Sequence, residues 1–256
     1  PLKKALTSTS TNVRIHSLWS LLRLGELTKE EHLAALKDSS PVVRTHACKA
    51  MIEIAEPEDA IRLAVVEALS DSDPFVQRAA AEALSVHPRY EHVRPLLLCL
   101  KSIPAEDNHL RHMVRISLRN QVAIPEVMAK TATLDLEAAE QLFLAEICVA
   151  VKSEPAGALA ARYAGADLGS PDLARELLTH AGRYAPPESI EDLVVAGRKV
   201  FANDREGQLQ VAFDLIGALT QRGASAPNSL KSWTADLVQE ELARRGQDPS
   251  SWRFVP

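Results

Sequence analysis

The apolar residues of the chain recur with the period of an amphipathic helix. One face is filled at positions i, i+4, i+7, i+8 and i+11 by Val43, Ala47, Ala50, Met51 and Ile54. This spacing places all five side chains on one side of a helix. The positions i+4 and i+7 hold small residues, which allow a neighbouring helix to approach closely. No segment shows a convincing strand pattern, so the chain is expected to be all-α.

The same template returns about every 33 residues. A shift of 33 places segment 35–51 over segment 68–84, with eight of the seventeen positions identical. Looser copies begin at Val13 and Leu110, so four units are visible before residue 125. A repeat of this length predicts an α-α superhelix, a solenoid of stacked antiparallel helix pairs of the HEAT type.

Shorter helices are expected before the template helices, over 29–37 and 58–70. They are joined through Asp-Ser-x-Pro, where the Pro suits the first helical turn and the residue before it can cap the helix. After residue 125 the period weakens, although helix-start signals continue, among them Ser153, Ser170, Asp204 and Asn228. We expect about fourteen helices in a single domain, 1–256, with regular repeats in 1–125 and degenerate repeats with a C-terminal cap in 126–256. The chain starts at Pro1 without an initiator Met, so it is expected to be excised from a longer protein.

Composition and charge narrow the functional classes. The formal net charge is −5, and residues 1–130 carry 17 basic and 16 acidic side chains. Nucleic-acid domains usually carry a basic excess, so this balance makes a nucleic-acid partner unlikely. No apolar run is long enough to span a bilayer. The three cysteines, Cys48, Cys99 and Cys148, lie within apolar helical patterns and are expected to be buried.

A short motif links the repeat to a known family. The motif Asp-x-x-Pro-x-Val-Arg occurs at Asp38, Pro41, Val43 and Arg44. It resembles the HEAT-repeat signature, in which the Asp and the Arg six residues later join in a hydrogen-bonded ladder between layers. The next copy has Asp71 but Gln77, and the first has Arg14 but Ser8. The resemblance therefore implies an incomplete ladder.

A closer likeness covers most of residues 10–125. Segments 13–25, 43–47 and 110–121 resemble the helical-repeat region of large multi-domain haem-binding proteins, of the membrane-bound dehydrogenase and cytochrome c type, from planctomycete and verrucomicrobial bacteria. In that family the region sits between a propeller-like dehydrogenase-type domain and a cytochrome c segment. The haem-attachment motif CxxCH is absent from this chain. The resemblance thus implies the architecture and an extracytoplasmic, periplasmic location, but no cofactor for this chain.

Basic residues make up the candidate interaction surface, with no catalytic, cofactor or metal residue among them. The candidates are Arg111, His112, Arg115, Arg119, Arg14, Arg44, His16 and His46. Arg111, Arg115 and Arg119 stand at i, i+4 and i+8, which aligns three guanidinium groups on one stripe of a helix. Such a stripe could bind phosphates or carboxylates, often with two hydrogen bonds per arginine. The alternative is that these arginines pair with acidic groups of adjacent repeats.

The histidines are expected to be structural. His16 and His46 occupy equivalent repeat positions, and no third ligand at a defined spacing would complete a metal site. A hydrogen bond between layers is the better interpretation for both. His87 and His92 are expected on the surface.

No catalytic motif is present, since the chain lacks GxGxxG, P-loop, HExxH and GxSxG sequences. The favoured function is a non-catalytic scaffold that binds a protein or neighbouring domains of its own chain, with no evident small-molecule substrate. Two alternatives stay open. One is a nucleic-acid-binding HEAT-like protein that uses the stripe of Arg111, Arg115 and Arg119, and the other is an enzyme of the bilin-lyase kind, whose members also carry HEAT-like repeats.

Overall fold

Every element of regular secondary structure in the described part of the chain is a helix. A computed structural model describes residues 1–166 and 169–246, apart from the side chain of Arg245, and shows fifteen α-helices, three short 3-10 helices and no strand in them. The expected all-α fold is confirmed. The chain divides into two compact units, Pro1–Thr131 and Ala132–Pro256. The single domain expected over 1–256 stays a prediction.

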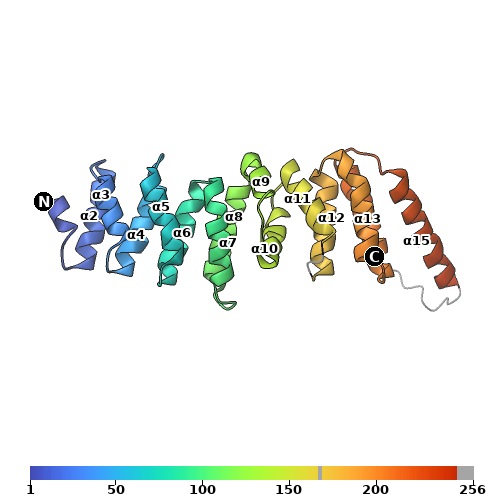
Figure 1. Cartoon of the computed structure of the whole chain (residues 1–256), viewed down its shortest axis with the longest axis horizontal. Coiled ribbons are helices and arrows are strands. Elements are labelled where there is room, and N and C mark those ends of the chain that lie inside the picture. The colour runs from blue at the N-terminus through green and yellow to red at the C-terminus, as the bar shows by residue number, and fades with distance from the viewer. Residues whose placement is uncertain (167–168, 247–256) are drawn as a thin grey trace. The chain divides into compact units, whose positions relative to one another are not determined.

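The N-terminal unit consists of helix pairs that succeed one another in chain order (Figure 1). Its α-helices are α1 (Leu2–Ala5), α2 (Thr11–Arg23), α3 (Lys29–Leu36), α4 (Pro41–Ile52), α5 (Asp59–Glu67), α6 (Pro74–Val86), α7 (Val93–Ser102), α8 (Asn108–Val122) and α9 (Pro125–Thr131). We call α1, α3, α5 and α7 the first helices and α2, α4, α6 and α8 the second helices. Each first helix packs on the second helix that follows it, and the second helices pack on one another from α2 to α8.

Small side chains bring the second helices together, as the repeat predicts. Ala47 and Ala50 on α4 are completely buried, and so are Ala80 and Ala83 on α6. The large residue of the template is buried too, as Met51, Leu84 and Leu118 show in successive repeats. Because alanine lets two helix backbones approach, each layer can close tightly on the next.

The turns between paired helices are held by aspartates. Asp73 caps α6, with its Oδ1 accepting from the backbone N–H of Phe75 at 2.8 Å. Ser40 stands at the same position before α4, but its side chain makes no capping bond. There Asp38 Oδ1 accepts from the backbone N–H of Ser40 at 2.8 Å. The expected cap is thus confirmed for Asp73 and wrong for Ser40, where the aspartate two residues earlier orders the turn.

The C-terminal unit contains α-helices of 11 to 19 residues. They are α10 (Ala138–Cys148), α11 (Glu154–Ala164), α12 (Pro171–Tyr184), α13 (Ile190–Val200), α14 (Arg205–Gln221) and α15 (Asn228–Gly246), with a 3-10 turn at Pro187–Ser189. Ser153, Ser170 and Asp204 cap α11, α12 and α14, as their sequence signals predict. None of the helices described in either unit has the length and apolar character that crossing a membrane requires.

Helices α11 and α12 approach each other unusually closely. A Cβ added to Gly157 on α11 would lie 2.3 Å from the backbone nitrogen of Ala185, immediately after α12. Only a residue without a side chain fits there. Gly157 therefore sets the distance between these two helices.

Candidate interaction surface

A ladder of arginines and aspartates runs through the N-terminal unit. Arg14 donates from Nε and Nη2 to the two carboxylate oxygens of Asp38 at 2.8 and 2.9 Å. Arg44 does the same with Asp71, at 2.7 and 2.8 Å. Each rung joins the arginine of one repeat to the aspartate of the next. Paired hydrogen bonds of this kind are among the strongest in proteins, so the rungs lock successive layers together.

Each rung also has a contact within its own repeat. Nη1 of Arg44 donates to the backbone carbonyl of Asp38 at 2.8 Å, and Nη1 of Arg14 donates to that of Ser8 at 2.7 Å. A serine at position 8 therefore suffices for this contact, because Arg14 uses only its carbonyl, and the Oγ of Ser8 accepts from the backbone N–H of Ser10 at 3.2 Å. Gln77 stands at the position of Arg44 in the next repeat and keeps only the backbone contact, with its Nε2 donating to the carbonyl of Asp71 at 2.7 Å. Two rungs are thus complete, and the side-chain series ends at Gln77.

The ladder determines the role of two candidate residues. The side chains of Arg14 and Arg44 are only 12% and 16% exposed. Hydrogen bonds from Arg44 hold the pKa of Asp71 below its usual value, and Asp71 in turn raises the pKa of Arg44. We therefore assign both arginines to contacts between repeats.

His46 makes the hydrogen bond between layers that its repeat position predicts. Trp19 on α2 donates from Nε1 to Nδ1 of His46 at 3.0 Å, with the two rings edge to face. Burial lowers the pKa of His46, and the nearby Lys49 and His16 lower it further. The bond needs an unprotonated Nδ1, so the lowered pKa favours it. His16 is exposed, and among the described residues its side chain has no such bond.

A buried amide joins α8 to α6, and sequence reasoning missed it. Gln121 is completely buried and donates from Nε2 to the carbonyl of Leu84 at 2.9 Å. Its Oε1 accepts from the backbone N–H of Arg89 at 2.7 Å and faces Nδ1 of His92 at 3.3 Å. His92 is only 3% exposed, so the expected surface position is wrong for it. A polar residue within an apolar template gives no sequence signal of its partners.

The arginine stripe divides into two parts on α8. Arg111 occupies the repeat position of Arg44 and donates from Nη1 to the carbonyl of Ile103 at 3.2 Å, as a ladder residue does. Arg115 is equivalent to Cys48 on α4 and Ala81 on α6, which are both completely buried. Arg111 and Arg115 therefore lie on the face of α8 that corresponds to the layer-contact face of α4 and α6.

The other part of the stripe is exposed to solvent. His112 and Arg119 are exposed, and Arg119 donates to the side chain of its neighbour Asn120 at 3.1 Å. Arg78 on α6 is equivalent to His112 in the repeat and is exposed as well. Arg78 forms no ion pair within the described residues. We call the exposed side of α6 and α8 that carries Arg78, His112 and Arg119, together with the equivalent side of α4, the second-helix face.

Charge is distributed unevenly in the N-terminal unit, whose residues are all described. Eight of its 17 basic residues lie on second helices, but only one of its 16 acidic residues, Glu82, does. The eight are Arg14, Arg23, Arg44, Lys49, Arg78, Arg111, Arg115 and Arg119. The ladder aspartates neutralise two of them, and Arg23 and Lys49 form partly exposed ion pairs with Glu53 and Glu82. On the second-helix face itself, Arg78 and Arg119 are exposed and form a short positive band, although the unit as a whole is nearly neutral.

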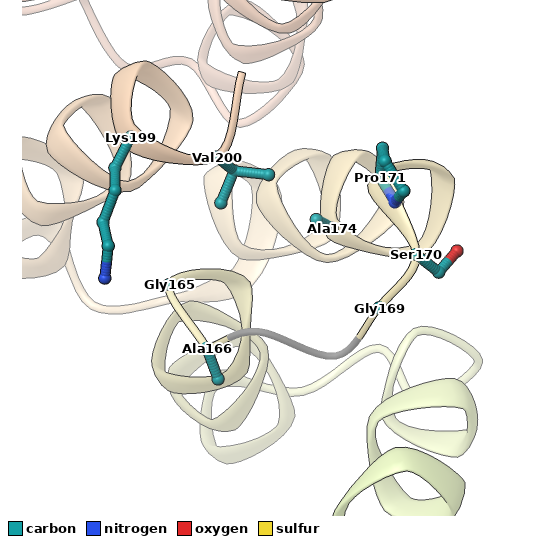
Figure 2. A pocket seen from close by; sticks show the side chains of 8 residues that line it. All are labelled: Gly165, Ala166, Gly169, Ser170, Pro171, Ala174, Lys199 and Val200. Atoms are coloured by element: carbon teal, nitrogen blue, oxygen red, sulfur yellow. The ribbon is translucent and has the colours of Figure 1, made fainter. Parts of the chain in front are cut away.

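One hollow in the C-terminal unit, of 480 Å³, lies between the start of α12 and the end of α13 (Figure 2). Small residues such as Ala166 and Ala174 form its walls, and Lys199 is the one charged side chain among the described residues that line it. Ser170 also lines it, but its Oγ accepts from the backbone N–H of Leu173 at 3.3 Å as a helix cap. We assign no chemistry to this hollow.

The cysteines are poor candidates for chemistry. All three are buried and free. Burial raises the pKa of Cys48 and Cys148 to about 12 and that of Cys99 to about 11. Because the thiolate is the nucleophile and the metal ligand, these thiols are unreactive at neutral pH. Among residues 1–166 and 169–246, no three His, Cys, Asp or Glu side chains form a group that could hold a metal ion.

Comparison with known families finds a likeness in the N-terminal repeats. The model of the family described as HEAT repeats matches residues 1–85 and, in an overlapping alignment, residues 30–101. The Arg14–Asp38 and Arg44–Asp71 rungs lie within the matched residues. No curated protein matches the chain significantly.

Several solved structures are similar at low identity. An engineered protein is 18% identical, with 91% of this chain and 96% of that chain covered and a TM-score of 0.44. The complex of CpcE and CpcF of phycocyanin lyase from Nostoc sp. PCC7120 is 15% identical, with 92% and 93% covered and a TM-score of 0.43. The Cnd3–Cnd2 subcomplex of S. pombe condensin is 13% identical, with 99% and 39% covered and a TM-score of 0.43. At these scores none of the three carries an argument about function.

Proposed function

We propose that the protein is a non-catalytic HEAT-repeat scaffold that holds a protein partner, or neighbouring domains of its own polypeptide, against the second-helix face. The observation that carries the proposal is the charge of the second-helix face, where Arg78 and Arg119 are exposed and the one acidic residue of the second helices, Glu82, is paired with Lys49. Charged surfaces that oppose a partner of the other sign guide association and orientation. The inert thiols agree with a binding role rather than a catalytic one.

A protein partner fits this face better than a nucleic acid. Carboxylates border the positive band, since Asp73 and Asp107 cap the starts of α6 and α8. They would repel a continuous phosphate backbone. The exposed apolar side chains of Val42 and Phe75 at the same ends suit a protein surface.

Site-specific crosslinking tests the proposal. A photo-crosslinking amino acid placed at His112, on the second-helix face, should capture a discrete partner in the native host. The same amino acid at Leu63, which is 64% exposed on α5, is the control and should capture none. Arg119→Glu should weaken capture at His112, whereas Lys4→Glu on α1 should not. Equal capture from both positions, or capture unaffected by Arg119→Glu, would contradict the proposal.

Two finer proposals concern the context of the scaffold. The likeness of residues 10–125 to multi-domain haem-binding proteins supports a place in such a parent protein, outside the cytoplasm. The sequence of the parent is the test, because a flanking propeller-like domain and a CxxCH segment are expected. The bilin-lyase alternative predicts tetrapyrrole binding, which an absorption titration of the purified chain would detect.

A further inference from the structure

The second-helix face has an apolar hollow at one edge. It has a volume of 330 Å³ and lies between the starts of α6 and α8, with Pro74, Phe75 and Arg78 on one side and Asp107, His109 and Leu110 on the other. Phe75 is 69% exposed, and Val42, at the equivalent position of α4, is 51% exposed. Every residue of this edge belongs to the N-terminal unit, so the hollow is complete within it.

The exposure of Phe75 is not required by the fold. Its place is the second residue of α6, where the helix is already started by Pro74 and capped by Asp73. The equivalent residue on α8 is His109, which is exposed and polar. A large apolar ring beside a hollow of this size forms a site where an apolar side chain of a partner can be buried away from solvent.

One cation, Arg78, borders the hollow on the side of the second-helix face, and one carboxylate, Asp107, lines its opposite side. Arg78 lies one helical turn beyond Phe75 on the same side of α6, because residues three apart share a helix face. His112 stands in the same relation to His109 on α8. Further along, Arg119 is exposed near the end of α8. The single acidic residue of the second helices, Glu82, is engaged by Lys49 at 3.9 Å.

We propose that the partner contributes an acidic segment with one large apolar side chain, which inserts into the hollow beside Phe75. Its carboxylates lie on the side of the hollow away from Asp107, where they pair with Arg78 and, further along the second-helix face, with Arg119. This inference rests on the proposed function and adds the chemistry of the bound segment. The apolar anchor sets the register of the segment, and the charges set its direction of approach.

Synthetic peptides test the anchor on the full chain. Two fluorescein-labelled peptides of twelve residues, built of Glu and Ala, differ only in a central Phe or Ser. The Phe peptide should bind at least about tenfold more tightly, as expected for an apolar anchor in a pocket. Phe75→Ser should abolish this difference. The matched control is Leu63→Ser, which removes a similarly exposed side chain from α5 and should leave the difference unchanged.

Charge-reversal variants separate this inference from the proposed function. Arg78→Glu should weaken both peptides, and Lys4→Glu should weaken neither. Equal binding of the Phe and Ser peptides overturns the anchor, while the scaffold proposal stands if Arg78→Glu still weakens them. If neither peptide binds, the inference is overturned. Binding of a labelled DNA duplex in their place, lost in Arg78→Glu, would overturn the scaffold proposal as well.

Discussion

At the scale of single residues, the Arg44–Asp71 rung makes a prediction about stability. Arg44→Met removes two bonds to the carboxylate of Asp71 and one to the carbonyl of Asp38, and it leaves a mostly buried carboxylate without its cation. The free energy of unfolding should fall by about 2 kcal/mol or more. Urea unfolding followed by far-UV circular dichroism measures the change.

The control for this variant is Arg23→Met. Arg23 pairs with Glu53 at 3.4 Å, but its side chain is 67% exposed. Exposed pairs contribute little, so the loss should stay below about 1 kcal/mol. Equal losses in the two variants would show that the ladder does not fasten the layers.

The Trp19–His46 bond predicts a dependence of stability on pH. The folded pKa of His46 is lowered from the ordinary value of about 6.5, so the folded state disfavours its protonated form. Its contribution to stability is complete above that value and is lost as the pH falls through the lowered folded pKa. Urea midpoints should therefore decrease on acidification below about pH 6.5.

His46→Gln removes the contribution of this histidine to the pH dependence of stability. The variant should show a smaller decrease between pH 7 and pH 5 than the unaltered chain, although His32, His92 and His180 also have lowered pKa values and will keep part of it. If His46→Gln has an unchanged pH profile, the bond from Trp19 does not contribute to stability.

At the scale of helices, the approach of α11 to α12 depends on Gly157. Gly157→Ala would place its methyl group within 2.3 Å of the Ala185 nitrogen, and backbone atoms cannot yield as a flexible side chain can. The free energy of unfolding should fall by about 3 kcal/mol, at the upper end of overpacking effects. Thermal and urea unfolding both report it.

Gly217→Ala is the matched comparison. Gly217 lies within α14 with no heavy atom within 4 Å of the added methyl group. The substitution should raise stability by about 0.5–1 kcal/mol, because alanine favours the helix. A similar sign for both variants would mean that α11 and α12 are not held at the distance described.

Much of the helix arrangement was predictable because small residues in a fixed template leave one packing solution. Ala47 and Ala50 showed where layers meet, and Ser153 or Ser170 showed where helices start. The stripe on α8 shows the limit, since periodicity placed Arg111, Arg115 and Arg119 on one side of a helix without saying which side. That required the buried counterparts of Arg115 in the preceding repeats.

The ladder and the candidate surface show what pattern alone cannot supply. The motif suggested a defect at Ser8, but Arg14 contacts only the carbonyl of that residue. Two partners of Gln121, the backbone N–H of Arg89 and the carbonyl of Leu84, lie 32 and 37 residues away in the sequence, and no local spacing indicates them. The exposure of Phe75 was equally hidden, because its position in the template is occupied by Val42 in one repeat and His109 in another.

At the scale of the molecule, the N-terminal unit should fold without the rest of the chain. Residues 1–131 have a core of their own and both rungs of the ladder. In repeat proteins stability comes from each repeat and its nearest neighbours. A fragment of residues 1–131 should therefore show helical circular dichroism and a cooperative urea transition, and Arg44→Met should destabilise it as it does the full chain. A fragment without helical signal would refute this expectation.

The reach of each rung, from one repeat to the very next, has a consequence for how such a chain can lengthen. A tandem duplication of residues 39–71 would add a second copy of Arg44 and of Asp71. The copied Arg44 would pair with the copied Asp71 and donate to the backbone carbonyl of the original one, while Gln77 would donate to the carbonyl of the copy. Growth by whole repeats is thus open to this gene without a compensating mutation in the ladder, and the repeats need not be equal in length, because Arg44 follows Arg14 by 30 residues and Gln77 follows Arg44 by 33.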